Sequence, residues 1–599
     1  MIFLNAFTDL GHKIIIQNTV FKVYDGSVQI VLTAIVNALI LLPFILIFTP
    51  SGFLSDRFSK NFILKYSSAA AFFLTILITF FYYQGWFLAA FVMTFLLATQ
   101  SAIYSPAKYG YIKELVGRYR LSSANAATQA VTTVAILGGI IFYSALFEMI
   151  VGNTVATQEQ MLQLVAPLGW LLILGSGINW FLASKLPHKL AKSRKRFVIK
   201  KYLTGYYLYK NIKITKRKGE IFDAILALSF YWAISQVVLA IFAEYAKSEV
   251  GVTNALVVQG IMALAGIGII IGCAYASRLS KVYINTALAS TGALFIFIIV
   301  SLITSTQSLP VLGALFLLLG FFSGFILVPM NAYIQYLAVP VHMGTILATN
   351  NLIQNIFMIF FLLVTTLFAY FGMDATFLFY VVSLMALYLF IKLVMKDYKK
   401  SLRAFLHFMF SLRYDIRYHN FAPQQNSGAK LVLSTHVSWI DWAVLQFGFD
   451  KPLWFMMDRG IYKRLRFVLQ HANIIALSTH GAAHGIKKAQ ELLQKGEIVA
   501  LFPEGKIVAS SDVGTINKGY MKIARLDEDF EIYALKIVGL HGSIFSRTRR
   551  FTLKNYLKRR KVDIYLSKPL PKDITPLQLK KHLELLGQQS ENYNTDITS

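Results

Sequence analysis

The chain has 599 residues, of which 56% are hydrophobic and 15% charged, and its mean hydropathy is +0.57. Soluble globular proteins usually have about 25% charged residues, so this composition excludes that class and indicates a membrane protein. Lys and Arg outnumber Asp and Glu by 58 to 29, which in an apolar chain indicates cations held on the cytoplasmic side of a membrane, so nucleic acid is not expected as a partner.

Twelve apolar segments are long enough to cross a bilayer, because a spanning helix takes about 20 residues. They are 2–22, 29–53, 62–82, 86–104, 125–148, 165–185, 221–245, 253–277, 283–304, 310–336, 345–371 and 375–396. The first is the most polar, since it contains Asp9, His12 and Lys13. A basic loop, 186–220, divides the twelve into two sets of six. The sequence therefore predicts an all-α membrane domain of twelve helices over 1–397.

Lysine and arginine are unevenly distributed over the connections between these segments. The connections 149–164 and 305–309, which would lie on one side of the membrane, contain neither residue. By contrast, Arg57, Lys60 and Lys65 follow the second segment. Because short cytoplasmic loops carry the excess of cations, we expect both termini of this multi-pass protein to lie in the cytoplasm.

A short motif follows the second apolar segment. Gly52 precedes Asp56 and Arg57, and Lys60 comes three residues later. Glycine permits a close backbone approach, and the carboxylate can accept charge-assisted hydrogen bonds from a neighbouring half-domain. The motif resembles the loop motif of the major facilitator superfamily. With the basic central loop, this resemblance implies a 6+6 transporter fold.

Further polar patterns lie within the apolar segments. They are Phe3-Leu-Asn5-Ala-Phe7-Thr-Asp9, Ser105-Pro106-Ala107-Lys108-Tyr109-Gly110, Val328-Pro329-Met330-Asn331-Ala332 with Gln335, and Gly344, Ala348, Asn350, Asn351, Gln354 and Asn355. Together they resemble the bacterial lysophospholipid transporter family. The resemblance implies a protein of the bacterial cytoplasmic (inner) membrane that moves lysophospholipid, notably the ethanolamine type, to the cytoplasmic leaflet.

Ionisable and amide side chains inside the spans are candidates for the transport path. Asp9 and Lys13 are four residues apart and share a helix face, so they can pair. The pair can be a site for a zwitterionic headgroup or a self-neutralising structural pair. The amides can line the path or tie helices together. The candidate residues are Asp9, Lys13, Lys108, Asn331, Gln335, Asn351 and Gln354.

The composition changes after the last apolar segment. Residues 398–424 mix Lys, Arg and His with Phe, Leu and Met, a pattern typical of an amphipathic helix on the membrane surface or of a linker helix packed on the next domain. Buried strands alternate with helical stretches over 425–585, which predicts a cytoplasmic α/β domain. The predicted strands are 429–435, 497–502 and 531–538. The polar end, 586–599, is expected to be disordered.

The most specific pattern is His436 followed by Asp441, with Phe502-Pro503-Glu504-Gly505 after a later strand. On one continuous helix, five residues correspond to about 140° of rotation, so His436 and Asp441 would point apart. They can meet if His436 lies in the loop after the strand and Asp441 in the first helical turn. Ser438 to Asp441 also fits a helix-start box, so Asp441 can instead serve as a cap.

This ordered pair of motifs resembles the glycerolipid acyltransferase family over about 425–570. The resemblance implies that His436 is the general base for attack of a lysolipid hydroxyl on an acyl thioester, and that Asp441 orients the imidazole. It assigns acceptor binding to Phe502, Pro503, Glu504, Gly505 and Lys506, with Ser438 beside them as a contact or helix cap rather than a nucleophile. The only cysteine, Cys273, lies in an apolar run, so thiol catalysis is not expected.

Two departures from lysophosphatidate acyltransferases narrow the range of acceptor lipids that we expect. Residues 474–480 contain no arginine for a phosphate monoester, and Lys506 directly follows Gly505. Both features resemble bifunctional acyltransferase/acyl-carrier-protein synthetase proteins, whose transferase remakes phosphatidylethanolamine. No synthetase domain is expected here, so acyl-carrier-protein or coenzyme A thioester must come from another protein. No other cofactor is expected, and no metal, because His480 and His484 lack an obvious third ligand.

The sequence thus predicts a bifunctional protein that flips lysophospholipid, notably lysophosphatidylethanolamine, to the cytoplasmic leaflet and reacylates it there. Two alternatives stay open. One is a lysophosphatidate acyltransferase of de novo phospholipid synthesis joined to a transporter. The other is a transporter whose C-terminal domain binds lipid without catalysis.

Overall fold

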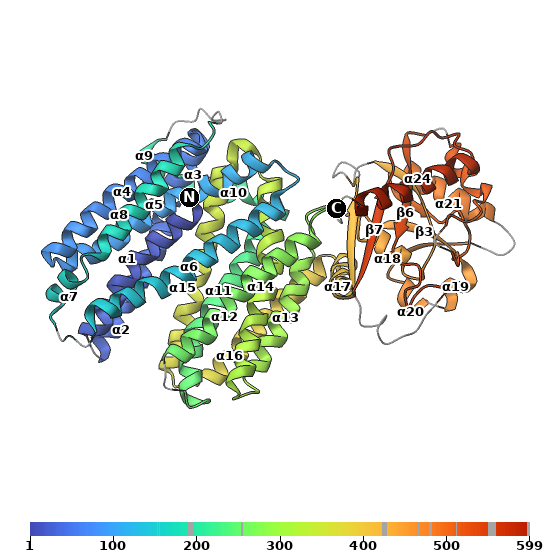
Figure 1. Ribbon diagram of the computed structural model, residues 1–599. Helices are drawn as coiled ribbons and strands as arrows, with labels where there is room; N and C mark the ends of the chain where they lie inside the picture. Colours follow the sequence, from blue (N-terminus) through green and yellow to red (C-terminus); the bar gives the residue numbers. More distant parts are fainter. Residues whose placement is uncertain are drawn as a thin grey trace. The chain divides into compact units, whose positions relative to one another are not determined.

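The computed structural model divides into two compact units, Met1–Lys396 (the N-terminal unit) and Asp397–Ser599 (the C-terminal unit) (Figure 1). The described residues of the N-terminal unit form helices and no strands, whereas the C-terminal unit contains a sheet. The structure describes residues 1–24, 26–152, 154, 156–188, 197–252, 255–421, 428–464, 466–477, 482–510, 512–526, 528–548 and 559–595.

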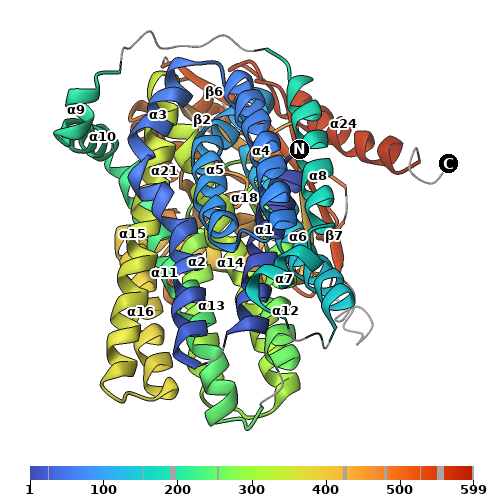
Figure 2. The ribbon, with the colours of Figure 1, turned by 90° about the vertical axis from the view of Figure 1, so that its left-hand side faces the viewer.

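The helices of the N-terminal unit are long apolar runs in which every main-chain polar group can be satisfied within the helix, as a bilayer requires. Figure 2 shows them side by side. They are α1 (Ile2–Val23), α2 (Gly26–Leu46), α3 (Phe48–Arg57), α4 (Lys60–Gln84), α5 (Phe87–Val116), α6 (Leu121–Val151), α7 (Gln158–Leu164), α8 (Leu168–Ser184), α9 (Ile199–Leu203), α10 (Tyr206–Lys216), α11 (Gly219–Ser248), α12 (Ala255–Leu279), α13 (Leu288–Ile303), α14 (Leu309–Leu337), the 3-10 turn η1 (Pro340–His342), α15 (Met343–Tyr370) and α16 (Ala375–Lys396).

Each of the twelve predicted segments contains a helix, but the helices are less uniform than predicted. Within the described ranges, eight are long and apolar enough to cross a membrane, or up to ten if the bent pairs α2/α3 (53°) and α7/α8 (57°) each form one span. Pro50 explains the first bend, because it lacks the N–H that would bond to Leu46. The other two helices fall short because α1 carries polar residues and α13 has only 16 residues.

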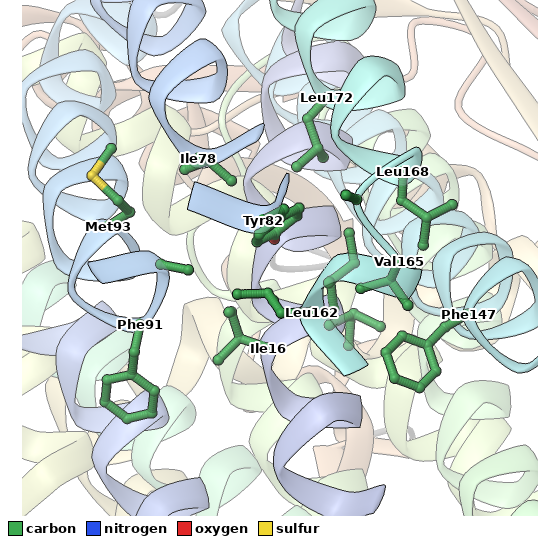
Figure 3. Packing of buried hydrophobic residues seen from close by; sticks show 14 of the residues in the cluster. Ile16, Ile78, Tyr82, Phe91, Met93, Phe147, Leu162, Val165, Leu168 and Leu172 are labelled. Atoms are coloured by element: carbon green, nitrogen blue, oxygen red, sulfur yellow. The ribbon is translucent and has the colours of Figure 1, made fainter. Parts of the chain in front are cut away.

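One apolar cluster holds α1, α4, α5, α6, α7 and α8 together (Figure 3). Tyr82 lies at its centre and is fully buried. Its hydroxyl is 2.7 Å from His12 Nδ1, and the other ring nitrogen of His12 is 3.1 Å from Thr94 Oγ1. The buried polar atoms are therefore paired, as a low-dielectric interior demands.

Helices α12 and α14 approach each other through glycines. A Cβ at Gly268 would lie 2.0 Å from Leu317 O, and one at Gly320 would lie 1.9 Å from Ala265 O. Gly272 and Gly324 are equally tight. We call these four residues the glycine seam. Small residues at such a contact let two main chains touch, which is how helices gain packing energy in lipid.

The C-terminal unit is a seven-stranded sheet with strand order β1-β7-β6-β2-β5-β3-β4. All neighbours are parallel except β6 and β7. Apolar clusters cover both faces, which explains why β2 is buried at every position. The elements are α17 (Tyr398–Arg413), β1 (Tyr414–His419), β2 (Ala429–Ser434), α18 (Asp441–Gln446), β3 (Leu453–Asp458), α19 (Arg459–Arg464), α20 (Arg466–Leu469), β4 (Asn473–Leu477), α21 (Ala482–Gln494), β5 (Ile498–Leu501), η3 (Lys518–Tyr520), α22 (Met521–Ala524), β6 (Phe530–Val538), β7 (Arg560–Leu566) and α24 (Pro576–Thr595).

The segment 398–424 differs from its prediction as a continuous surface linker. Helix α17 ends at Arg413, and the chain continues as β1, which pairs with β7. The helix packs on its own unit, because the His407 ring stacks on Phe447 at 4.7 Å between centroids. Burial there lowers the pKa of His407 to about 3. Of the two alternatives for this helix, the arrangement around His407 therefore agrees with a linker helix that packs on the following domain.

Two other segments are more ordered than predicted. The basic loop 186–220 contains α9 and α10, although 189–196 lie outside the described residues. The polar end from 586 onward is helical as far as Thr595, because α24 continues through it.

Candidate functional sites

The first site lies where β2 ends and α18 begins. His436 is in the loop between them, and its Nδ1 is 2.9 Å from Asp441 Oδ2. That oxygen also accepts the backbone N–H groups of Val437 (2.7 Å) and Ser438 (2.8 Å). With the Nδ1 proton donated to Asp441, Nε2 of the imidazole, whose side chain is 23% exposed, is the nitrogen that can take up a proton. The sequence predicted that the two side chains meet if His436 lies in the loop and Asp441 in the first helical turn, and the structure has this arrangement.

The Asp441 carboxylate is completely buried. Burial raises the pKa of Asp441, and its hydrogen bond with His436 opposes that rise. Asp441 also accepts the Ser438 N–H, but α18 begins at Asp441 itself and its N-cap residue, Ile440, makes no side-chain capping bond, so the helix-start box from Ser438 is not formed. Ser438 Oγ donates to the carbonyl of Phe545 (3.1 Å) and is buried, so it binds a neighbouring loop.

Glu504 connects the two sequence motifs directly. Its Oε2 accepts the backbone N–H of His436 at 2.6 Å, and its Oε1 accepts that of Gly514 at 2.7 Å. The side chain is 4% exposed, and burial raises the pKa of Glu504. A further bond, from Val508 N–H to His436 O at 2.8 Å, fixes the same loop. Both carboxylate oxygens thus accept hydrogen bonds from main-chain donors, and the contact of Glu504 with the acceptor stays a prediction.

An apolar cavity of about 330 Å³ opens beside His436. The imidazole stacks on Phe502, 4.3 Å between centroids, and both rings line the cavity with Pro503 and Gly505. Most of the remaining wall is aliphatic or aromatic, as in Met456, Leu477, Ile486 and Phe455. Lys506 is exposed and lies outside the lining. Such a wall suits an alkyl chain.

Sequence reasoning missed the loop after β6. Trp439 N–H donates to Phe545 O at 3.0 Å, and Ser438 pairs with Ser546 as an isolated bridge. This loop therefore lies beside the His436 loop and carries exposed Arg547. The basic run from Arg547 was a usable signal, but the parallel sheet brings it here from about a hundred residues away in sequence. Its continuation, 549–558, lies outside the described residues.

In the N-terminal unit, the loop motif connects the two six-helix halves. Asp56 accepts the N–H of Gly344 (2.5 Å) and both the N–H (3.1 Å) and the hydroxyl (2.6 Å) of Thr345. It therefore satisfies the open N-terminus of α15, where a negative charge is favourable. Gly52 lies against the same helix, and Arg57 lies over the rings of its neighbours Phe53 and Phe58.

The predicted Asp9–Lys13 ion pair is wrong, since these side chains form no salt bridge in the described part of the chain. Asp9 instead accepts Asn5 Nδ2 at 3.0 Å and the hydroxyl of Ser101 on α5. A shared helix face allowed the pair, but the carboxylate turns toward α5, whose hydroxyl satisfies it without the cost of ordering a lysine. Lys13 is half-buried.

Two of the four candidate amides tie helices together. Gln335 and Asn125 exchange hydrogen bonds of 2.8 and 3.1 Å between α14 and α6. Asn351 donates to Ser105 on α5 at 3.0 Å, so α5 contacts both α1 and α15 through its polar face. The other candidates bond locally: Gln354 to Asn350 Oδ1 (2.9 Å), Asn331 to Leu327 O (2.9 Å), and Lys108 over the Tyr109 ring (4.7 Å).

Comparison with known families decides the architecture. Residues 1–362, more than half of the chain, match the family model described as Major Facilitator Superfamily. The chain belongs to this superfamily. Residues 415–537 match the model described as Acyltransferase, so this major facilitator protein also carries an acyltransferase domain in its C-terminal unit.

Curated relatives match the major facilitator part. Lysophospholipid transporter LplT of Klebsiella pneumoniae is 26% identical over 270 residues, 45% of this chain and 64% of the relative. LplT of Yersinia enterocolitica is 24% identical over 45% of this chain and 62% of its own length. LplT of Photorhabdus laumondii is 27% identical over 60% of this chain and 84% of its own length. The chain thus spans slightly less than two thirds of the first two of these relatives.

Solved structures agree on the superfamily fold. The E. coli fucose:proton symporter FucP aligns with a TM-score of 0.53 at 13% identity, over 66% of this chain and 96% of FucP. The human organic anion transporter MFSD10 aligns with a TM-score of 0.52 at 16% identity, over 65% and 97%. These likenesses concern the fold alone. As a major facilitator superfamily member with long apolar helices, the protein is a multi-pass membrane protein.

Metal ligation finds no support at either site. Among the residues searched, which are those described, no group of three or more His, Cys, Asp or Glu side chains is arranged to hold a metal ion. His480, one half of the weighed His480–His484 pair, lies outside the described residues.

Proposed function

We propose that this protein moves lysophospholipid to the cytoplasmic leaflet and then transfers an acyl group from a thioester to its free hydroxyl. The observation that carries the proposal is the His436–Asp441 pair, with His436 among the residues that line an apolar cavity. The names of the LplT relatives support lysophospholipid as the cargo. We place the protein in the cytoplasmic membrane of a bacterium with both termini in the cytoplasm, as the cation bias indicates.

The proposed reaction needs one base and no covalent enzyme intermediate. Nε2 of His436 removes the proton from the lysolipid hydroxyl while that oxygen attacks the thioester carbonyl carbon. The tetrahedral intermediate collapses, the carbon–sulfur bond breaks, and the imidazolium returns its proton to the leaving thiolate. Asp441 stabilises the imidazolium between these steps. General base catalysis of this kind contributes about 10²–10⁴-fold in rate.

Glu504 acts in this scheme as a positioning residue. It holds the main chain of His436 from one side while Asp441 holds the ring from the other. Two fixed points leave the imidazole little freedom, and rigid placement of the base lowers the entropy cost of the attack. This geometry supports a working catalytic site rather than a passive lipid-binding domain.

The acceptor is proposed to be lysophosphatidylethanolamine, and the donor acyl-carrier-protein or coenzyme A thioester. A zwitterionic phosphodiester needs fewer cations than a phosphate monoester. Among the described residues, no lysine or arginine lines the cavity beside His436, and Lys506 lies outside its lining. The apolar wall takes one alkyl chain. The transport step would raise the local concentration of acceptor at the second site.

The test uses purified full-length protein in liposomes with labelled lysophosphatidylethanolamine and either donor. We expect labelled diacyl lipid, and we expect lysophosphatidate to be a poorer acceptor. His436→Ala should lower the rate at least about 10²-fold while lysolipid flipping continues. The matched control is His419→Ala, because His419 pairs with Asp563 at 2.8 Å elsewhere in the same unit. No diacyl product with any donor, or an active His436→Ala variant, would exclude the proposed enzyme.

A further inference from the structure

The segment that joins the two six-helix halves is strongly cationic. Residues 197–218 contain seven Lys and Arg residues and no Asp or Glu. They form α9 and α10, which Figure 2 shows together at the upper left, at one end of the long helices. Cations at this density repel one another, so the folded segment needs a source of negative charge outside itself.

Part of this charge converges on a cavity of about 420 Å³. Three cations line it, and none of the described residues in its lining is an Asp or Glu. Within the described ranges none of the three forms a salt bridge; Lys210 and Lys213 lie over the rings of Tyr206 and Tyr209, at 5.8 and 5.5 Å. The lining includes Tyr206, Tyr209, Lys210, Lys213, Arg217 and His342. Tyrosine hydroxyls and cations around one hollow form a binding site for an oxyanion.

Exposed apolar side chains lie on α9, which contacts α10, and on α10 itself. Ile199 is 68% exposed and Leu203 is 77% exposed, both on α9. Tyr209, on α10, is 64% exposed although it also lines the cavity. A surface that combines Lys and Arg with exposed aliphatic and aromatic groups is typical of a helix lying in the headgroup region of a bilayer. A soluble anion would leave these apolar groups in water, whereas a lipid would cover them.

We propose that α9 and α10 bind an anionic membrane phospholipid, with its phosphodiester held by Lys210, Lys213 and Arg217. The acyl chains then lie along Leu203 and its apolar neighbours. Each cation near an anionic surface strengthens lipid binding severalfold. Three cations around one phosphate therefore bind a lipid at this position more tightly than the rest of the basic surface does. The site is separate from the acyltransferase cavity and does not depend on the acyltransferase reaction.

The position of α10 gives this lipid a structural effect. A neighbouring cavity of about 230 Å³ is lined by Lys201 and Lys210 from the cationic segment, by Asp56 from α3 and by Thr345 from α15. Asp56 and Thr345 form the contact between the two halves described above. A lipid that holds α10 in place therefore stabilises this contact, and its binding should raise the melting temperature of the whole protein.

The experiment titrates detergent-solubilised full-length protein with phosphatidylglycerol, and binding is measured by native mass spectrometry and by melting temperature. The pocket variant is the triple Lys210→Gln, Lys213→Gln, Arg217→Gln. We expect its affinity to fall more than about tenfold and the lipid-dependent rise in melting temperature to be lost. Size-exclusion profile and melting without lipid check that the variant folds. If the triple does not fold, the single Lys213→Gln takes its place, with an expected loss of about fivefold.

The control variant removes the same charge at exposed positions away from the hollow: Lys185→Gln, Lys281→Gln and Lys392→Gln. We expect it to keep its affinity within about threefold. Equal losses in both triples would overturn the proposal and leave only general attraction to a basic face. A second arm adds inorganic phosphate and glycerophosphoglycerol. Full competition by either at millimolar concentration would assign the hollow to a soluble anion instead, and weak competition supports the lipid.

Discussion

Replacing Glu504 by glutamine separates two roles for this residue. In the structure its carboxylate accepts two main-chain N–H groups, from His436 at 2.6 Å and from Gly514 at 2.7 Å. Glutamine has the same shape but only one oxygen, so one of these donors would face an NH₂ group. The side chain is nearly inaccessible to water, so solvent cannot restore the lost bond.

The size of the effect follows from this geometry. Leaving one buried donor unsatisfied costs about 1–3 kcal/mol, which should lower the melting temperature. One of the two donors is the backbone N–H of His436. If this N–H faces the NH₂ group of glutamine, the two donors repel each other, and the His436 imidazole moves relative to the acceptor hydroxyl. A misplacement of about 1 Å can cost up to about 10² in rate. We expect kcat to fall about 10- to 100-fold, with the KM values of both substrates changed less than about threefold.

The assay is steady-state acyl transfer by full-length protein with both substrates varied, together with thermal melting. Glu497→Gln is the matched control, because that side chain lies beside β5 and outside the cavity lining. The reasoning would be refuted by a raised acceptor KM at unchanged kcat and unchanged melting temperature. That result would mean that Glu504 binds the acceptor, as the family resemblance implied.

Three further predictions concern other parts of the molecule. Asp441→Asn should lower acyl transfer about 10²–10⁴-fold with lysolipid flipping intact, as measured in the same liposomes. Because burial raises the pKa values of Asp441 and Glu504, the folded state holds these protons more tightly than the unfolded state. Stability should therefore decline as the pH rises from about 4 through the raised values, and a melting series should show a flatter profile for Glu504→Gln. Gly320→Val should destabilise the N-terminal unit by about 1–3 kcal/mol, whereas Gly138→Val, which has open space around its Cβ, should be tolerated in the same melting assay.

The acyltransferase motifs could be placed from sequence because of where strands end. The apolar runs at 429–435 and 497–502 predict strands, and β2 and β5 are parallel neighbours, with Leu433 opposite Leu501. The carboxyl ends of neighbouring parallel strands meet at one edge, so His436 and Glu504 come together there. The direction of the Glu504 carboxylate could not be predicted, since its partners are main-chain groups of two loops.

Other elements carried weaker signals. Strand β1 follows α17 without a break and shares its mixture of basic and aromatic residues, so it was predicted as part of a surface linker. Its partner β7 is far away in sequence, and long-range pairing decides its conformation. The orientation of Asp9 was missed for a similar reason, because Ser101 lies on another helix. Local spacing shows which groups can meet, and tertiary packing selects among them.

The glycine seam between α12 and α14 has a mechanical consequence. Side chains at most helix contacts can change rotamer and let one helix slide past another, but here carbonyl oxygens occupy the space where Cβ atoms would be. A translation of either helix would move the four glycines out of register with the main-chain atoms that they face. The two helices are therefore expected to move as one rigid body during any alternation of access. The displacement that opens a path must then be absorbed at contacts made by side chains, such as that of Asp56 with α15.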